Sequence, residues 1–71
     1  MRLRLETRSG RVVTLVLGLV GQETQLAELA RLLRTACSAG GALRDGVIEL
    51  QGDQREKAKA ALAAQGIKAQ T

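Results

Sequence analysis

The residues best suited to chemistry in this chain are the arginines Arg8 and Arg11, which flank Ser9-Gly10 near the N-terminus. The apolar alternation on either side of them predicts a hairpin with this basic segment at its tip. A guanidinium presents a planar fork of N–H donors that matches a phosphate or a carboxylate. The pair therefore indicates either a phosphate-binding tip or an ordinary solvated turn.

A second candidate lies at Asp53-Gln54-Arg55-Glu56. The spacing predicts that Asp53 caps a helix and forms a capping box with Glu56. Gln54 and Arg55 then stand in the first helical turn. Capping does not require Gln and Arg at these two positions. Since the N-terminus of a helix attracts anions, these two residues are candidates for binding, whereas Asp53 is first a structural cap.

Composition excludes most other chemistry. The chain of 71 residues has no His and a single cysteine, Cys37. Zinc sites built from His and Cys, Ser-His-Asp triads and disulfides are thereby ruled out. The remaining acids and serines form no constellation with a nucleophile, base or metal set, so we expect no enzyme, no catalytic residue, no metal and no cofactor. Cys37 is expected to be a small buried hydrophobe.

The charge is uneven along the chain. Residues 1–11 hold four arginines and one glutamate, whereas the whole chain has a net charge of +4. A basic end on a near-neutral body indicates a polyanion such as nucleic acid as partner. The apolar run 12–20 is far shorter than the roughly 20 residues of a membrane span. No targeting segment is recognisable, so we expect a cytoplasmic protein without membrane contact.

The elements that must position these residues follow from periodicity. Alternating residues predict strands at 2–6, 12–17, 42–44, 47–51 and 67–69, and helical spacing predicts helices at 22–36 and 54–65. Asp45-Gly46 is a strong two-residue hairpin signal. The order β-β-α-β-β-α-β predicts a single-domain α+β fold, a two-layer α/β plait with both helices packed on one face of a mixed sheet.

Within the second strand, alternation predicts Val13, Leu15 and Leu17 in the core. The residues expected on the exposed sheet face are Arg4, Val12, Thr14, Val16, Glu49 and Gln51. The chain contains no aromatic residue, so bases cannot be stacked on this sheet. Any RNA contact should rest on phosphates and shape rather than on sequence readout.

One pattern extends over nearly the whole chain. It runs through Leu26-Ala27-Glu28-Leu29, Cys37 to Gly41, Asp45 to Arg55 and Gly66-Ile67-Lys68, and its most specific part is Leu50-Gln51-Gly52-Asp53-Gln54-Arg55. The chain resembles the eukaryotic-type translation initiation factor 1 family (Sui domain), in particular its short bacterial and archaeal members.

This resemblance implies a protein that binds the small ribosomal subunit near the P site and tunes start-codon and initiator-tRNA selection. It implies contacts of Arg8 and Arg11 with ribosomal RNA and with the initiator tRNA. It also adds Arg31 and Arg34 of the first helix to the RNA-binding candidates, beside Gln54 and Arg55.

Two departures keep alternatives open. The first loop is shorter and less basic than is usual in that family, and the net charge is small. A protein-interaction module of the same fold, or a repressor of translation initiation without a strong RNA contact, are the alternatives. We expect a monomer in each case.

Overall fold

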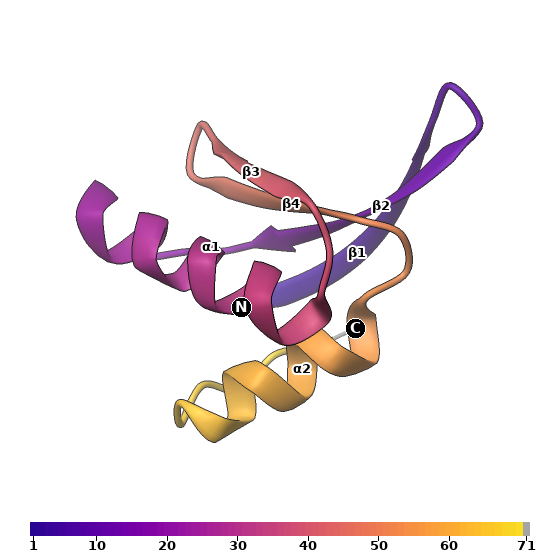
Figure 1. Cartoon of the computed structure of the whole chain (residues 1–71). Helices are drawn as coiled ribbons and strands as arrows, with labels where there is room; N and C mark the ends of the chain where they lie inside the picture. The colour runs from indigo at the N-terminus through magenta and orange to yellow at the C-terminus, as the bar shows by residue number, and fades with distance from the viewer. Residues whose placement is uncertain (71) are drawn as a thin grey trace.

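The computed structural model describes residues 1–70 and contains four strands and two helices (Figure 1). The elements are β1 (Arg2–Arg8), β2 (Arg11–Leu17), α1 (Glu23–Cys37), β3 (Gly41–Arg44), β4 (Val47–Gln51) and α2 (Arg55–Ala64). The expected order of these six elements is confirmed.

The strands form one sheet in the order β1-β2-β4-β3, and every neighbouring pair is antiparallel. Both helices lie against the same face of this sheet, below it in Figure 1. The expected α+β fold with two layers is thereby confirmed. Within residues 1–70, no helix covers the opposite face of the sheet, which we call the open face.

The expected last strand at 67–69 is replaced by a single bridge. Gln70 pairs with Arg2 in parallel, where the Leu3 amide donates to the Gln70 carbonyl at 2.7 Å and the Gln70 amide donates to the Met1 carbonyl at 3.0 Å. A sheet with both parallel and antiparallel strands was expected, and this bridge is its only parallel pairing among the described residues. The described tail after Gly66 pairs with β1 only at this bridge, and Ala69, 8% exposed, packs into the core beside it.

The core lies between the sheet and the helices. Leu33 of α1, Leu62 of α2, and Val16, Ile48 and Leu50 of the sheet are fully buried there. The two helices expected from helical spacing are confirmed, each with buried residues on the side toward the sheet, and Cys37 is buried as expected. Burial raises the pKa of its thiol.

The orientation predicted for β2 is wrong. Val16 belongs to the core between sheet and helices, and Thr14 turns its hydroxyl to the start of α2 on that same side. Leu15 pairs with Glu49 and therefore lies on the open face, with Val13 and Leu17 on either side. The alternation could not decide between the two faces because β2 is apolar on both.

The first hairpin is longer than expected. Its turn consists of only Ser9 and Gly10, whose φ angles of 49° and 78° are both positive, as a type I′ turn requires. The second hairpin turns in the same way at Asp45-Gly46, as predicted. The expected turn at 7–11 thus shrinks to two residues.

Candidate nucleic-acid interface

The end of the first hairpin brings Arg8 and Arg11 together, since they are cross-strand partners in the β1–β2 ladder. The two side chains differ in their surroundings. Arg8 Nη1 donates to Glu49 Oε1 at 3.0 Å, and Arg8 Nη2 donates to Glu6 Oε2 at 3.3 Å. The hydrogen bond to Glu6 is the largest factor that raises the pKa of Arg8.

Arg11 is exposed, and no ion pair engages it among residues 1–70. An incoming phosphate can therefore reach Arg11 directly, whereas it must compete with two carboxylates for Arg8. Arg8 lies in β1, which the two-residue turn extends to this residue, and its side chain reaches Glu49 of β4.

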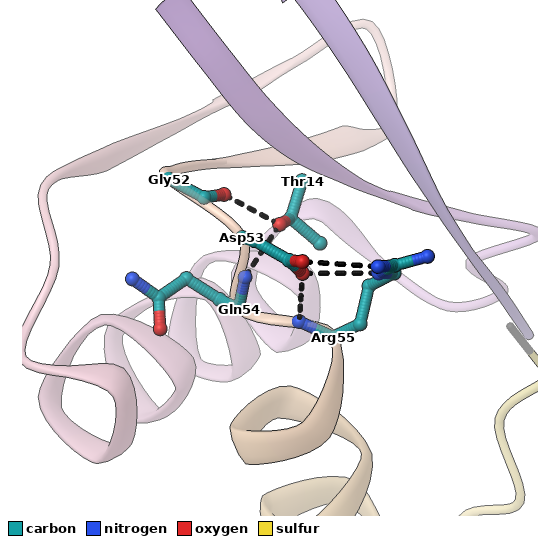
Figure 2. Close-up of polar contacts among 5 residues, drawn as sticks. All are labelled: Thr14, Gly52, Asp53, Gln54 and Arg55. Carbon is teal, nitrogen blue, oxygen red and sulfur yellow. Dashed lines mark hydrogen bonds and ion pairs between the residues drawn. The ribbon is translucent and has the colours of Figure 1, made fainter.

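The junction between β4 and α2 holds the second group of candidates (Figure 2). Asp53 does not cap α2 in the expected way, because the N-cap residue is Gln54 and the helix begins at Arg55. Asp53 Oδ1 accepts from the Arg55 amide at 3.3 Å and from Arg55 Nε at 3.0 Å, while Oδ2 accepts from Arg55 Nη2 at 3.0 Å.

The expected capping box is therefore wrong, since Glu56 stands at the second helical position and not at the third. The fork of hydrogen bonds has an electrostatic consequence: the Arg55 guanidinium and its hydrogen bonds lower the pKa of the Asp53 carboxyl. Both side chains are exposed, so the pair is solvated. The positive charge of Arg55 is thus already paired with the carboxylate of Asp53.

Thr14 is the residue at this junction that sequence reasoning missed. Its hydroxyl donates to the Gly52 carbonyl at 2.7 Å and accepts from the Gln54 amide at 2.8 Å. Figure 2 shows the hydroxyl between these two backbone groups. A polar residue within the apolar run of β2 was the one signal that could have found it, because a buried hydroxyl needs partners.

Gln54 does not join Arg55 in a common site. Its side chain points away from the Asp53–Arg55 pair in Figure 2, and its Nε2 donates to the Gln51 carbonyl at 3.0 Å. Arg31 and Arg34 are both exposed on α1, which Figure 1 places apart from the tip of the first hairpin. Arg31 and Arg34 therefore form a group apart from the hairpin end, whereas the β4–α2 junction adjoins the base of that end, since the Gly52 amide donates to the Val12 carbonyl at 2.8 Å.

Two further observations bear on the kind of site. Within residues 1–70, no three His, Cys, Asp or Glu side chains are grouped so that they could hold a metal ion. No helix of the described residues combines the length and the hydrophobicity needed to cross a membrane.

The chain is similar to known proteins over most of its length. It is 44% identical over 61 residues to the protein YciH of Escherichia coli (strain K12), an alignment that covers 86% of this chain and 56% of that protein. The chain thus spans just over half the length of this relative.

Archaeal proteins named translation factor SUI1 homologs are similar as well. The chain is 44% identical over 64 residues to that of Picrophilus torridus, which covers 89% of this chain and 65% of the relative. It is 38% identical over 64 residues to that of Methanothermobacter thermautotrophicus, which covers 90% of this chain and 63% of the relative.

The family model described as translation initiation factor SUI1 matches residues 1–68. This range takes in the first hairpin, both helices and the Asp53–Arg55 junction. The chain belongs to the SUI1 family.

Proposed function

We propose that the chain acts in the cytoplasm as a translation initiation factor. It binds the small ribosomal subunit near the P site through ribosomal RNA and tunes the selection of the start codon and the initiator tRNA. The observation that carries this proposal is the SUI1 family match over residues 1–68, together with relatives named translation factor homologs.

Arg11 is the principal phosphate contact in this proposal, because it is exposed at the hairpin end without an acidic partner among the described residues. Arg8 contributes when RNA displaces Glu6 and Glu49 from its guanidinium. Arg31 and Arg34 add a second basic strip on α1. Gln54 and Arg55 make a weaker contribution, since the structure engages the first with Gln51 and the second with Asp53.

The test is co-sedimentation with purified small ribosomal subunits over a range of salt concentrations. Binding through phosphates weakens with salt by a slope of about −0.7 to −0.9 per phosphate neutralised. We expect Arg11→Ala to reduce this slope by about one phosphate, and Arg8→Ala combined with Arg11→Ala to weaken binding further. Lys59→Ala is the matched control, because it removes one exposed charge from α2 outside the proposed contact.

Two results would contradict the proposal. Absence of binding at low salt would favour a protein-interaction module of the same fold. If Lys59→Ala lost as much affinity for the small subunit as Arg11→Ala, binding would depend only on the net charge of the protein. A reconstituted initiation assay with matched AUG and non-AUG messages then separates start-codon selection, which changes the ratio of the two products, from repression, which lowers both.

A further inference from the structure

A row of apolar side chains runs along the middle of the open face. Leu15 of β2 pairs with Arg4 of β1 and with Glu49 of β4, so these three side chains share that face. Val13 and Leu17 continue the row on either side, because alternate residues of a strand point the same way. The solvated face of an antiparallel sheet usually carries polar residues at such positions. The apolar row therefore needs an explanation.

Arginines border this row on both sides. Arg4 lies on β1, and Arg44 lies on β3 two residues from Ala42, which pairs with Glu49. Among the described residues, the strands contribute five arginines and two glutamates to the open face, a net charge of +3 in a chain of net charge +4. These residues are Arg2, Arg4, Arg8, Arg11, Arg44, Glu6 and Glu49.

The two glutamates are already satisfied. Arg8 binds Glu6 at 3.3 Å and Glu49 at 3.0 Å, which neutralises part of the negative charge of the open face. Within residues 1–70, no ion pair engages Arg4 or Arg44. The open face thus presents Val13 and Leu17, both half-buried, on either side of Leu15, which is only 4% exposed, between arginines that take part in no ion pair of the described residues.

We propose that the open face is a docking surface for an acidic amphipathic helix of a partner protein. From Val13 to Leu17 the row is about 13 Å long at roughly 3.3 Å per residue, which matches two to three helical turns of about 5.4 Å. Three strand spacings of about 4.8 Å separate β1 from β3 by roughly 14 Å. The row on β2 lies one spacing from β1 and two, roughly 10 Å, from β3. A helix about 10–12 Å wide on the row therefore places carboxylates of one flank beside Arg4, and those of the other flank face Arg44.

The charge and composition of the face argue against other occupants. A second copy would set one face of charge +3 against another. RNA would place hydrated phosphates against Val13, Leu15 and Leu17, and the chain has no aromatic side chain on which a base could stack. An acidic helix instead matches the apolar row with its own apolar stripe and the arginines with its carboxylates. The apolar row and its flanking Arg4 and Arg44 do not include Arg8 and Arg11, which lie at the hairpin end of the same face, and the proposal does not depend on the RNA contact proposed above.

The test uses the intact chain and a labelled synthetic peptide of about 15 residues, helical, with leucines along one face and glutamates on its flanks. Arg4→Glu combined with Arg44→Glu is compared with Lys57→Glu combined with Lys59→Glu, which changes the charge equally on exposed positions of α2. We expect the arginine double variant to weaken fluorescence-anisotropy binding at least about tenfold and the lysine variant to change it far less. A scrambled peptide of equal composition should bind weakly.

Chemical-shift mapping on the unmutated protein provides a second, independent measurement. We expect amide shifts at Val13, Leu15, Leu17 and Arg44 when the peptide is added, and none along the exposed side of α2. The proposal is overturned if the peptide does not bind, if it shifts α2 instead, or if both double variants lose binding equally. It is also overturned if a short RNA duplex, rather than the peptide, binds in a manner that depends on Arg4 and Arg44.

Discussion

At the scale of single residues, Thr14 fastens the start of α2 to the sheet. Its hydroxyl is fully buried and is both donor and acceptor, with the Gly52 carbonyl and the Gln54 amide as partners. A hydroxyl can serve both groups at once, whereas a side chain of the same shape without oxygen can serve neither. This oxygen therefore helps to position the start of α2, and with it Asp53 and Arg55, while Ala58 and Leu62 anchor the helix in the core.

We expect Thr14→Val to lower the free energy of unfolding by about 1–3 kcal/mol, because the substitution leaves two backbone groups without their partner. Thr14→Ser keeps the hydroxyl and loses one methyl group, so it should cost less and should preserve the protection of the Gln54 amide from hydrogen exchange. Urea unfolding of the three proteins measures the difference. Equal losses in the two variants would show that packing, not the hydroxyl, decides stability at this position.

The role of Thr14 could not be predicted from the sequence, because its partners lie 38 and 40 residues further along the chain. The engagement of Arg8 was missed for a similar reason, since Glu49 is 41 residues away and becomes its neighbour only through the β2–β4 pairing. Residue types alone selected the arginines as candidates for anion binding. They could not show that Arg8 and Arg55 already bind carboxylates of the chain.

At the scale of elements, the β3–β4 hairpin depends on a close approach of two backbones. A Cβ atom at Gly41 would collide with the backbone carbonyl oxygen of Glu49 on the paired strand, whereas one at Gly40 would meet only the Gln51 side chain at 3.5 Å. Glycine within a strand often marks such a close approach. Two adjacent glycines thus differ in what they can be replaced by.

We expect Gly41→Ala to destabilise the protein by about 1–3 kcal/mol, because β3 must move away from β4 to make room for the methyl group. Gly40→Ala is the matched control and should stay within about 0.5 kcal/mol of the unmutated protein. Thermal unfolding followed by circular dichroism compares the three. If the two alanine variants melt at the same temperature, the close approach of Gly41 to Glu49 does not limit the hairpin.

Elements with a clear period or a clear turn signal were predictable, and those that depend on distant partners were not. The inner face of α1 and the strand β4 follow from spacing alone, and Asp45-Gly46 fixes the second turn. The cap of α2 was predicted one residue too early, at Asp53 instead of Gln54, because Thr14, not an acidic cap, holds the Gln54 amide. The strand expected at 67–69 lacks a partner beyond the single bridge at Gln70.

At the scale of the whole molecule, the fold separates its two kinds of candidate surface. The open face combines five arginines and two glutamates with an apolar row, whereas the two helices on the other face carry five cations and three acids. Sequence arithmetic located the excess charge near the N-terminus but could not place it on one face, because that depends on the register of β1 against β2. The ion pairs of Arg8 connect the hairpin end with the open face.

The connection leads to a prediction about the whole charge distribution. Glu49→Gln releases one carboxylate from Arg8 and raises the net charge by one, whereas Glu23→Gln raises the net charge equally at the start of α1, where no ion pair is recorded among residues 1–70. If the hairpin end binds ribosomal RNA, Glu49→Gln should bind small subunits more tightly than Glu23→Gln, and its salt slope should steepen by about 0.7 to 0.9, the contribution of one more phosphate. Co-sedimentation over a salt series compares the two variants with the unmutated protein. If the two variants changed affinity and salt slope equally, the gain would come from long-range electrostatic attraction alone. Arg8 would then remain paired with Glu6 in the bound state.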